Sequence, residues 1–251
     1  MHNALILHYH QSADDTNSSV AAEVFTAQLS LIKKLKMPVV SLEELVENNY
    51  KRKRWHRHVI LISCTDTFLA QNPTVCETLK AAGLPVAVFI AADAGAEQIP
   101  FWQELIAAGF SLGVRSVPEL SLSQLPEPEI SLELAELKQR IEAATGTPVR
   151  SLLPFTNDLN KKVVTAALEV GFEAVLTRKV GYNRFNADLR CLKTWIVPPH
   201  ISLQAFGRML CRDKKELLTQ ELKAQALKNG RRIIEKSLLG KLKGLFSRVR
   251  V

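Results

Sequence analysis

Short apolar runs alternate with amphipathic helical segments along most of this chain, and this alternation restricts its fold more than any other feature. The clearest run, HVILIS at 58–63, is continuous and rich in β-branched residues, as in a parallel strand covered on both faces. Several helical segments stop at a glycine, the preferred residue just beyond a helix end. These glycines are Gly83, Gly109, Gly146 and Gly171. The pattern predicts consecutive parallel β–α units.

The number of these units favours a closed barrel. We expect strands at 4–9, 58–63, 86–90, 111–114, 149–153, 174–177 and 195–197, with helices between them. Seven or so units within about 210 residues suit an α/β fold with a parallel (β/α) barrel, and an open doubly wound sheet remains the alternative. Neither a G-x-G-x-x-G after the first strand nor a Walker loop is present, so nucleotide binding is not favoured.

Composition and charge divide the chain into two parts. Hydrophobic residues make up 47% of the 251 residues, which excludes a disordered chain and predicts a sizeable core. The formal net charge is +8, and residues 213–251 hold 11 Lys/Arg against 4 Asp/Glu. We therefore expect a nearly neutral barrel at 1–212 and a basic helical extension at 213–251. A nucleic-acid partner is not expected, because the body lacks a large basic surplus.

The cysteines and the N-terminus indicate a cytoplasmic protein. The four cysteines form neither a C-x-x-C pair nor a zinc-like spacing, which is typical of reduced thiols in the interior. The first residues do not resemble a secretory signal, and no run approaches the roughly 18 apolar residues of a spanning helix. A peripheral position at the inner face of the membrane is compatible with these features.

Polar residues follow the predicted strands, where the active site of a parallel barrel lies. They occur in four segments: His8–His10, Cys64–Thr67, Arg115–Glu119 and Pro154–Asn157. In this order they resemble the polysaccharide deacetylase (NodB-homology) family over about residues 4–210. LILHYHQ at 5–11 is similar to the family's opening strand and ILISCTDTF at 60–68 to its S-F-D-D-G-F motif. TGTPVRSLLPF at 145–155 is similar to its arginine–proline–aromatic segment.

The resemblance implies a distorted seven-stranded barrel and a metal-dependent N-deacetylase that hydrolyses a C–N amide bond. In the family, one aspartate is the general base, and a second aspartate binds a divalent metal with two histidines. Here Thr65 stands at the base position, Asp66 is kept, and Arg115 and Glu119 replace the two histidines. The family's arginine falls at about Leu152.

These replacements remove the usual chemistry. Metal-assisted hydrolysis needs a cation that acidifies a water and a base of suitable pKa, and a threonine hydroxyl is no such base. We therefore expect no cofactor; if the protein is active, Zn or a similar divalent metal would be held by Asp66 and Glu119. Alternatively, Asp66 caps a turn or forms an ion pair with Arg115.

Other residues at the predicted mouth are candidates for binding or catalysis. His8 and His10 alternate with Tyr9 and so project from one strand face. In a rearranged site, His10 and Asp66 would be the catalytic pair, while His8, Arg115, Phe155 and Trp195 would contact the substrate. The simpler interpretation is that the histidines are satisfied polar side chains, Glu119 is a solvated carboxylate, and the aromatic residues belong to the core.

The end of the chain carries a separate signal. Residues 231–251 hold 7 Lys/Arg and one acidic residue, and Ile234, Leu238, Leu242, Leu245 and Val249 recur at helical spacing. An apolar stripe beside cations is typical of a helix in the interface of an anionic membrane. The alternative is a helix that packs its stripe on the barrel.

Three functions are compatible with these residues. The first is a polysaccharide deacetylase-like protein of cell-surface glycan or glycolipid metabolism that is catalytically impaired or inactive and binds carbohydrate. The second is an active hydrolase of amide or N-acetyl bonds with a rearranged site. The third is a membrane-docked interaction or regulatory protein.

Overall fold

The computed structural model describes residues 3–10, 20–116, 122–155 and 159–226. The strands are β1 (Asn3–Tyr9), β2 (Val59–Thr65), β3 (Val86–Ala91), β4 (Ser111–Arg115), β5 (Ser151–Leu153), β6 (Ala174–Thr177), β7 (Asn183–Arg184) and β8 (Leu192–Ile196). The helices are α1 (Ala22–Lys34), α2 (Leu42–Tyr50), α3 (Asp66–Gln71), α4 (Pro73–Ala81), α5 (Ile99–Ala107), α6 (Glu127–Thr145), α7 (Lys161–Glu169) and α8 (Leu203–Leu210), and a further helix covers 214–226.

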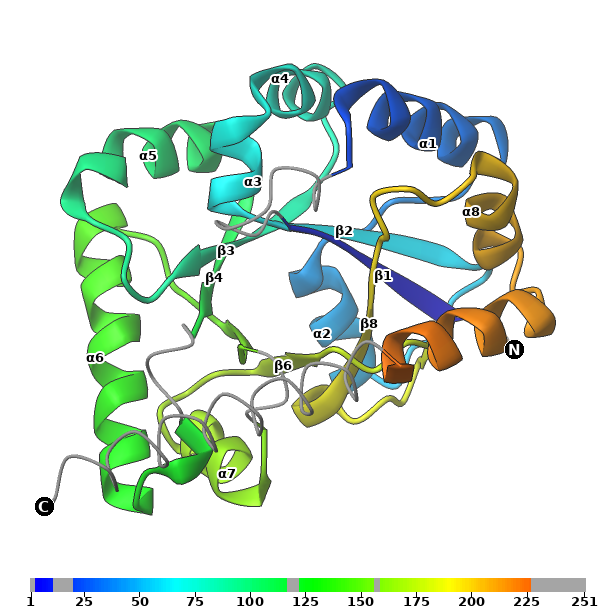
Figure 1. Ribbon diagram of the computed structural model, residues 1–251. Coiled ribbons are helices and arrows are strands. Elements are labelled where there is room, and N and C mark those ends of the chain that lie inside the picture. Colours follow the sequence, from blue (N-terminus) through cyan, green and yellow to red (C-terminus); the bar gives the residue numbers. More distant parts are fainter. Residues whose placement is uncertain (1–2, 11–19, 117–121, 156–158, 227–251) are drawn as a thin grey trace, which may run out of the picture.

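Seven of the strands form a closed parallel ring in the order β1–β2–β3–β4–β5–β6–β8 (Figure 1). The ring closes because β1 pairs in parallel with β2 on one side and with β8 on the other, as in the pairs His8–Ser63 and Leu7–Trp195. The two-residue β7 pairs antiparallel with the start of β1, outside the ring. The predicted seven-stranded (β/α) barrel is confirmed, and the open sheet is wrong.

The inner face of the barrel is filled by every second residue of the strands. Ala4 and Ile6 of β1, Leu61 of β2 and Phe89 of β3 belong to one buried apolar cluster. Side chains of α2 join this cluster, and Figure 1 shows α2 through the ring of strands. The helix α2 therefore closes the amino-terminal end of the barrel, and the opposite end is left for polar residues.

A glycine makes room for the largest of these inner side chains. A Cβ atom on Gly113 of β4 would lie 2.6 Å from Phe89 Cε1 and 2.5 Å from Ser151 Oγ. Because protein interiors are close-packed, no larger residue fits there without moving its neighbours. Phe89 thus crosses the barrel just below the polar end, where its ring meets that of His8 at 6.1 Å.

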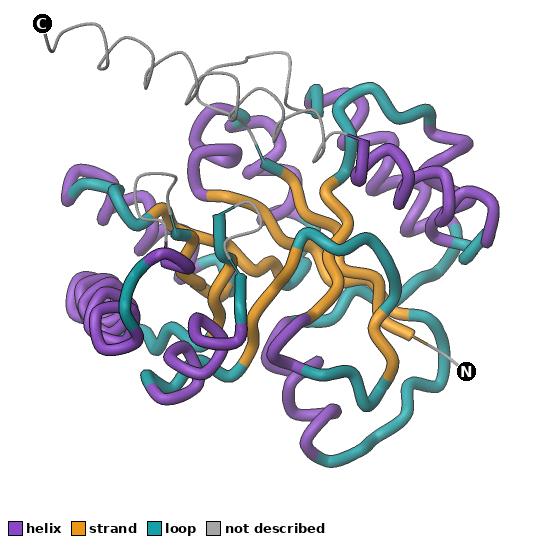
Figure 2. The backbone as a smooth tube through the Cα atoms, turned by 60° about the horizontal axis from the view of Figure 1, so that its bottom comes forward, coloured by secondary structure: helices purple, strands orange, loops and turns teal. Residues whose placement is uncertain are grey.

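A second, larger apolar cluster lies between the ring and the surrounding helices. Figure 2 shows the strands inside and most helices outside. Alternate strand residues such as Leu5, Leu7, Ile62 and Val88 contact this cluster, together with the buried faces of the outer helices. The continuous burial of β1, β2 and β3 explains their uninterrupted apolar sequences.

The local signals for helix ends are confirmed in detail. The Ser41 hydroxyl accepts a hydrogen bond from the Glu44 amide at 3.0 Å, so the predicted cap begins α2. Gly83, Gly109 and Gly171 follow their helices with positive φ. The short α3, directly after β2, was not expected from the sequence, because only six residues separate its two caps.

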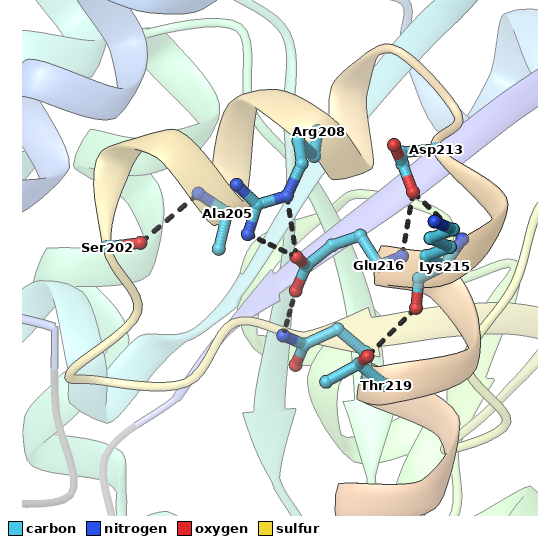
Figure 3. Close-up of polar contacts among 8 residues, drawn as sticks. Ser202, Ala205, Arg208, Asp213, Lys215, Glu216 and Thr219 are labelled. Atoms are coloured by element: carbon cyan, nitrogen blue, oxygen red, sulfur yellow. Dashed lines mark hydrogen bonds and ion pairs between the residues drawn. The ribbon is translucent and has the colours of Figure 1, made fainter.

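The described start of the C-terminal extension is attached to the barrel domain (Figure 3). Asp213 caps the helix at 214–226 by accepting from the amides of Lys215 and Glu216. The Glu216 carboxylate accepts two hydrogen bonds from Arg208 of α8, at 2.9 and 2.7 Å, and a third from Gln220. The boundary predicted at 212/213 therefore falls at a helix cap beside a packed contact.

From the sequence we also expect that the chain has no membrane-spanning helix and that its end forms an amphipathic helix. None of the helices in the described part of the chain has the length and apolar character needed to cross a bilayer. The segment at 231–251, for which we expect an amphipathic helix, lies outside the described residues.

Candidate functional site at the mouth of the barrel

The carboxyl ends of the strands bring the predicted polar residues to one end of the barrel. The pairs His8–Ser63 and Ala91–Arg115 place β1, β2, β3 and β4 side by side at this end. Ser116 follows Arg115 and its hydroxyl accepts a hydrogen bond from the Phe155 amide at 2.7 Å. We call this end of the barrel the mouth.

His8 lies at the bottom of the mouth, in contact with the barrel interior. It is 3% exposed, and its Nδ1 is 3.0 Å from Ser63 Oγ. The Ser63 hydroxyl donates to the Leu7 carbonyl, so its single proton is used and Nδ1–H must donate to Ser63. We therefore assign the neutral tautomer that leaves a lone pair on Nε2.

Burial and neighbouring cations keep His8 neutral. Burial is the main cause that places its pKa well below 6.5, and the charges of His10, Arg178 and Arg115 act in the same direction. The His10 ring centroid lies 6.2 Å from that of His8. The predicted neighbourhood of the two histidines is therefore present.

Thr65 has a structural role as a helix cap. Its hydroxyl accepts from the Phe68 amide at 3.2 Å as the N-cap of α3, and from the Thr67 hydroxyl at 3.0 Å. A hydroxyl is also too weakly basic to take a proton from water near neutral pH. The residue at the family's base position thus begins a helix.

Asp66 is a buried carboxyl at the first position of the same helix. It is 1% exposed, and its Oδ1 accepts from the Thr67 amide at 2.8 Å. Among the described residues, neither Asp66 Oδ2 nor the Trp102 indole nitrogen has a hydrogen-bond partner, although Trp102 is close enough to lower the pKa of Asp66. Burial outweighs the favourable neighbours and raises the pKa of Asp66 above its ordinary value.

Arg115 acts on this carboxyl from a distance. Its charge lowers the pKa of Asp66 after the larger influences of burial and the Thr67 amide. Within the described part of the chain, no ion pair joins the two side chains, so the structure does not form the direct contact that we considered. The Arg115 carbonyl accepts from the Ala92 amide, which keeps the strand end in place.

The described residues do not fit the family's divalent metal. They contain no group of three or more His, Cys, Asp or Glu side chains placed to hold an ion. Asp66 supplies one oxygen without a partner, but a guanidinium stands where a ligand is needed, and like charges repel. Glu119, the other predicted ligand, lies outside the described residues.

Phe155 and Trp195 have different environments. The half-buried Phe155 lies under the Arg178 guanidinium at 5.5 Å from the ring centroid. Trp195 is 1% exposed and stacks on Phe206 of α8 at 5.8 Å, in the cluster between ring and helices. A sugar ring has no access to Trp195 in this arrangement, so its predicted substrate contact is replaced by a core role.

Arg178 is a residue of the mouth that sequence reasoning missed. It follows β6 directly, contacts Phe155 and influences His8. Its position after a predicted strand was the available signal, since side chains after every parallel strand meet at this end.

Comparisons with known proteins agree with this architecture. A sequence model of the family described as "Polysaccharide deacetylase" matches residues 56–175. The resemblance to the polysaccharide deacetylases is confirmed. No curated protein sequence gives a significant match.

Solved deacetylase structures share the fold at low sequence identity. Streptococcus pyogenes deacetylase PplD in complex with acetate is 15% identical, with a TM-score of 0.70 over 81% of this chain and 95% of that one. IcaB from Ammonifex degensii is 17% identical, with a TM-score of 0.69 over 84% and 97%. The putative polysaccharide deacetylase BA0330 from Bacillus anthracis is 18% identical, with a TM-score of 0.67 over 83% and 69%. The deacetylase-like barrel therefore spans most of the chain.

Proposed function

We propose that this chain is a cytoplasmic, polysaccharide deacetylase-like protein of cell-surface glycan or glycolipid metabolism, in which the usual metal-assisted removal of acetyl groups is impaired or lost. The observation that carries the proposal is the placement of Arg115 at the mouth, where the family has a metal-binding histidine. A guanidinium cannot ligate a cation and raises the energy of one nearby.

The residue at the base position supports the same proposal. Metal-assisted hydrolysis needs a carboxylate or imidazole to accept a proton from water. The Thr65 hydroxyl caps α3. Asp66 is buried with a raised pKa, which disfavours the charged form that binds a metal.

Groups that suit carbohydrate binding remain at the mouth. Phe155 offers a half-buried aromatic face, and Arg115 and His8 offer donors and an acceptor for hydroxyl groups. Aromatic faces and a few directed polar groups are typical of small-ligand sites. We propose that the protein binds an N-acetylated oligosaccharide at the mouth without hydrolysing it.

The alternative is an active hydrolase with a rearranged site. Two observations favour it: the lone pair on His8 Nε2, and an Asp66 Oδ2 that has no hydrogen-bond partner among the described residues. In that enzyme, His10 and Asp66 would act on the amide, with Glu119 as a further ligand if a metal is used.

An assay with N-acetylglucosamine oligomers separates the two. We expect no acetate release from the full-length protein, with or without added Zn²⁺, and binding that shows as line broadening in the NMR spectrum of the sugar. Phe155→Ala should weaken binding about fivefold, since an aromatic stacking contact contributes roughly 1 kcal/mol. The matched control is Phe185→Ala, since Phe185 also lies under an arginine, Arg54, but away from the mouth.

Each outcome has a clear meaning. Acetate release that Asp66→Asn abolishes would overturn the inactive assignment and establish the rearranged hydrolase. Equal weakening by both phenylalanine variants, or no binding of any oligomer, would overturn carbohydrate binding at the mouth.

A membrane role for the end of the chain is proposed from its sequence. The seven cations and the apolar stripe of 231–251 suit an anionic bilayer, to which each cation adds on the order of 1 kcal/mol. Docking would place the protein at the inner face of the membrane.

A further inference from the structure

Cations gather on the face of the barrel opposite the mouth. The segment between α1 and α2 pairs with the start of β2 at Val39–Ile60, and α2 packs on the inner cluster at the amino-terminal end of the barrel. The end of α1 and the whole of α2 therefore lie at this end. The Arg57 guanidinium donates to the Lys36 carbonyl at 3.3 Å, which joins the end of α1 to the segment after α2. We call the exposed cations here the basal patch: Lys33, Lys34, Lys36, Arg52, Lys53, Arg54 and Arg57.

The patch is strongly charged although the body is nearly neutral. Residues 33–57 contain eight Lys/Arg and three Glu, a surplus of five. One of the glutamates, Glu47 of α2, pairs with Lys51, the C-cap residue of that helix. Acidic residues elsewhere in residues 1–212 balance this surplus. The net charge of that part of the chain is therefore close to zero and does not reveal the patch.

Backbone conformations show an unusual use of cations at this face. Among the described residues, the non-glycine residues with positive φ are Lys36 at 50°, Arg52 at 52° and Arg212 at 61°. They follow α1, α2 and α8, at the position where Gly83, Gly109 and Gly171 follow other helices. A glycine would relieve the strain.

The helix dipole explains only part of this choice. A cation near a helix C-terminus is favourable by itself. However, Lys53, Arg54 and Arg57 lie beyond the last turn of α2 and gain little from it. The cluster therefore points to an external anionic partner.

Apolar side chains between the cations indicate which partner. Tyr50 is 66% exposed and Leu35 39%, and Trp55 is half-buried against the inner cluster. Tyrosine and tryptophan are enriched where a bilayer meets water. An exposed leucine between lysines gains free energy by entering the headgroup region, whereas the phosphates of a nucleic acid offer it no contact.

We propose that the basal patch is a docking surface for an anionic lipid bilayer. Phosphate headgroups would contact the cations, and Leu35, Tyr50 and Trp55 would enter the interface. The mouth would then face the aqueous side, so that its ligand arrives from solution. The surface is separate from the segment 231–251 and does not depend on the function of the mouth.

Co-sedimentation with vesicles tests the surface in the full-length protein. We expect binding to phosphatidylcholine vesicles containing phosphatidylglycerol, loss of binding in high salt, and none to phosphatidylcholine alone. The triple variant Lys33→Gln, Lys34→Gln, Lys53→Gln should bind about 100-fold more weakly, because each cation contributes roughly fivefold. The matched control, Lys161→Gln, Lys162→Gln, Lys179→Gln, removes three exposed cations elsewhere and should bind like the unchanged protein.

Tryptophan fluorescence gives a direct readout of contact. Trp102 and Trp195 are buried, so Trp55 is the tryptophan that a quencher can reach. Vesicles with brominated acyl chains should quench its emission, and Trp55→Phe should remove that quenching. Melting curves of each variant report whether it is folded.

The opposite results would overturn the proposal. They are equal binding to neutral vesicles, no quenching of Trp55 in bound protein, or equal loss in both lysine variants. Binding that depends only on Lys241, Lys243 and Arg248 would assign all membrane contact to the chain end. Binding of single-stranded RNA that the patch variant loses, with vesicle binding unchanged, would assign the patch to nucleic acid.

Discussion

At the scale of single residues, several side chains at the mouth already have structural contacts. Thr65 caps a helix, and Ser63 links His8 to the Leu7 carbonyl. His8 is held neutral by burial and by nearby cations. A neutral, buried imidazole must take up a proton when the chain unfolds below pH 6.5, so His8 links stability to pH.

We predict that His8 makes the protein less stable in mild acid. Its folded pKa is depressed, so the unfolded chain binds more protons as the pH falls below 6.5. Between about pH 7.5 and about pH 5.5, this group should lower the free energy of unfolding by about 1.4 kcal/mol. Urea unfolding measures the free energy of unfolding at each pH. In His8→Gln this decrease towards acid should be absent, and in His200→Gln, a substitution at an exposed site, it should remain. Identical slopes in all three proteins would show that His8 does not titrate in this way.

At the scale of secondary structure, the contact between α8 and the helix at 214–226 decides where the folded body ends. Glu216 is 6% exposed and accepts from Arg208 and Gln220 (Figure 3). Burial opposes its charge, but the hydrogen bonds from Gln220 and Arg208 lower the pKa of Glu216 overall. The described start of the extension is therefore part of the folded body.

Replacing Arg208 should show how much the contact with Glu216 contributes to stability. Arg208→Ala leaves the buried Glu216 carboxylate with Gln220 as its side-chain donor. We expect the free energy of unfolding to fall by about 1.5 kcal/mol. This value is at the low end for hydrogen bonds to charged groups because Arg208 is half exposed. Since the pKa of Glu216 is depressed, the deficit should shrink as the pH falls below 4.5. Arg190→Ala, which breaks an exposed pair with Asp188, should cost under about 0.5 kcal/mol in the same denaturation assay. A larger loss of stability in Arg190→Ala than in Arg208→Ala would contradict a stabilising role for the contact between Arg208 and Glu216.

At the scale of the whole molecule, closure of the ring depends on β1. This strand is buried along its whole length and pairs with β2 and β8 at once. Opening either side would expose both apolar clusters, since their residues alternate along β1. We therefore regard β1 and β2 as the most stable part of the protein.

Hydrogen exchange should show that β1 and β2 are more stable than the rest of the protein. Amides of Leu5–Leu7 and Ile60–Ile62 should exchange only through global unfolding, and those of the helix at 214–226 earlier, through local opening. Mass spectrometry of peptides from these segments measures the difference, with the exposed segment 51–57 as the fast reference. If β1 exchanged with the reference segment, the ring would not be closed in solution.

Local patterns in the sequence determined most of the fold. The runs at 58–63 and 86–90, the cap at Ser41 and the terminal glycines act over a few residues, so they can be recognised without the rest of the chain. The number and parallel order of such units then favoured the barrel. The same local order placed His8, Asp66, Arg115 and Phe155 at one end.

Only the tertiary structure decided which of those side chains meet. The distance between Asp66 and Arg115, the burial of Trp195 against Phe206 and the contact of Arg178 with Phe155 depend on strand register and barrel shape. The basal patch likewise appears only when the ends of α1 and α2 come together, because a net charge sums residues that folding separates. Contacts between distant segments are collective results of packing, and no short stretch of sequence contains them.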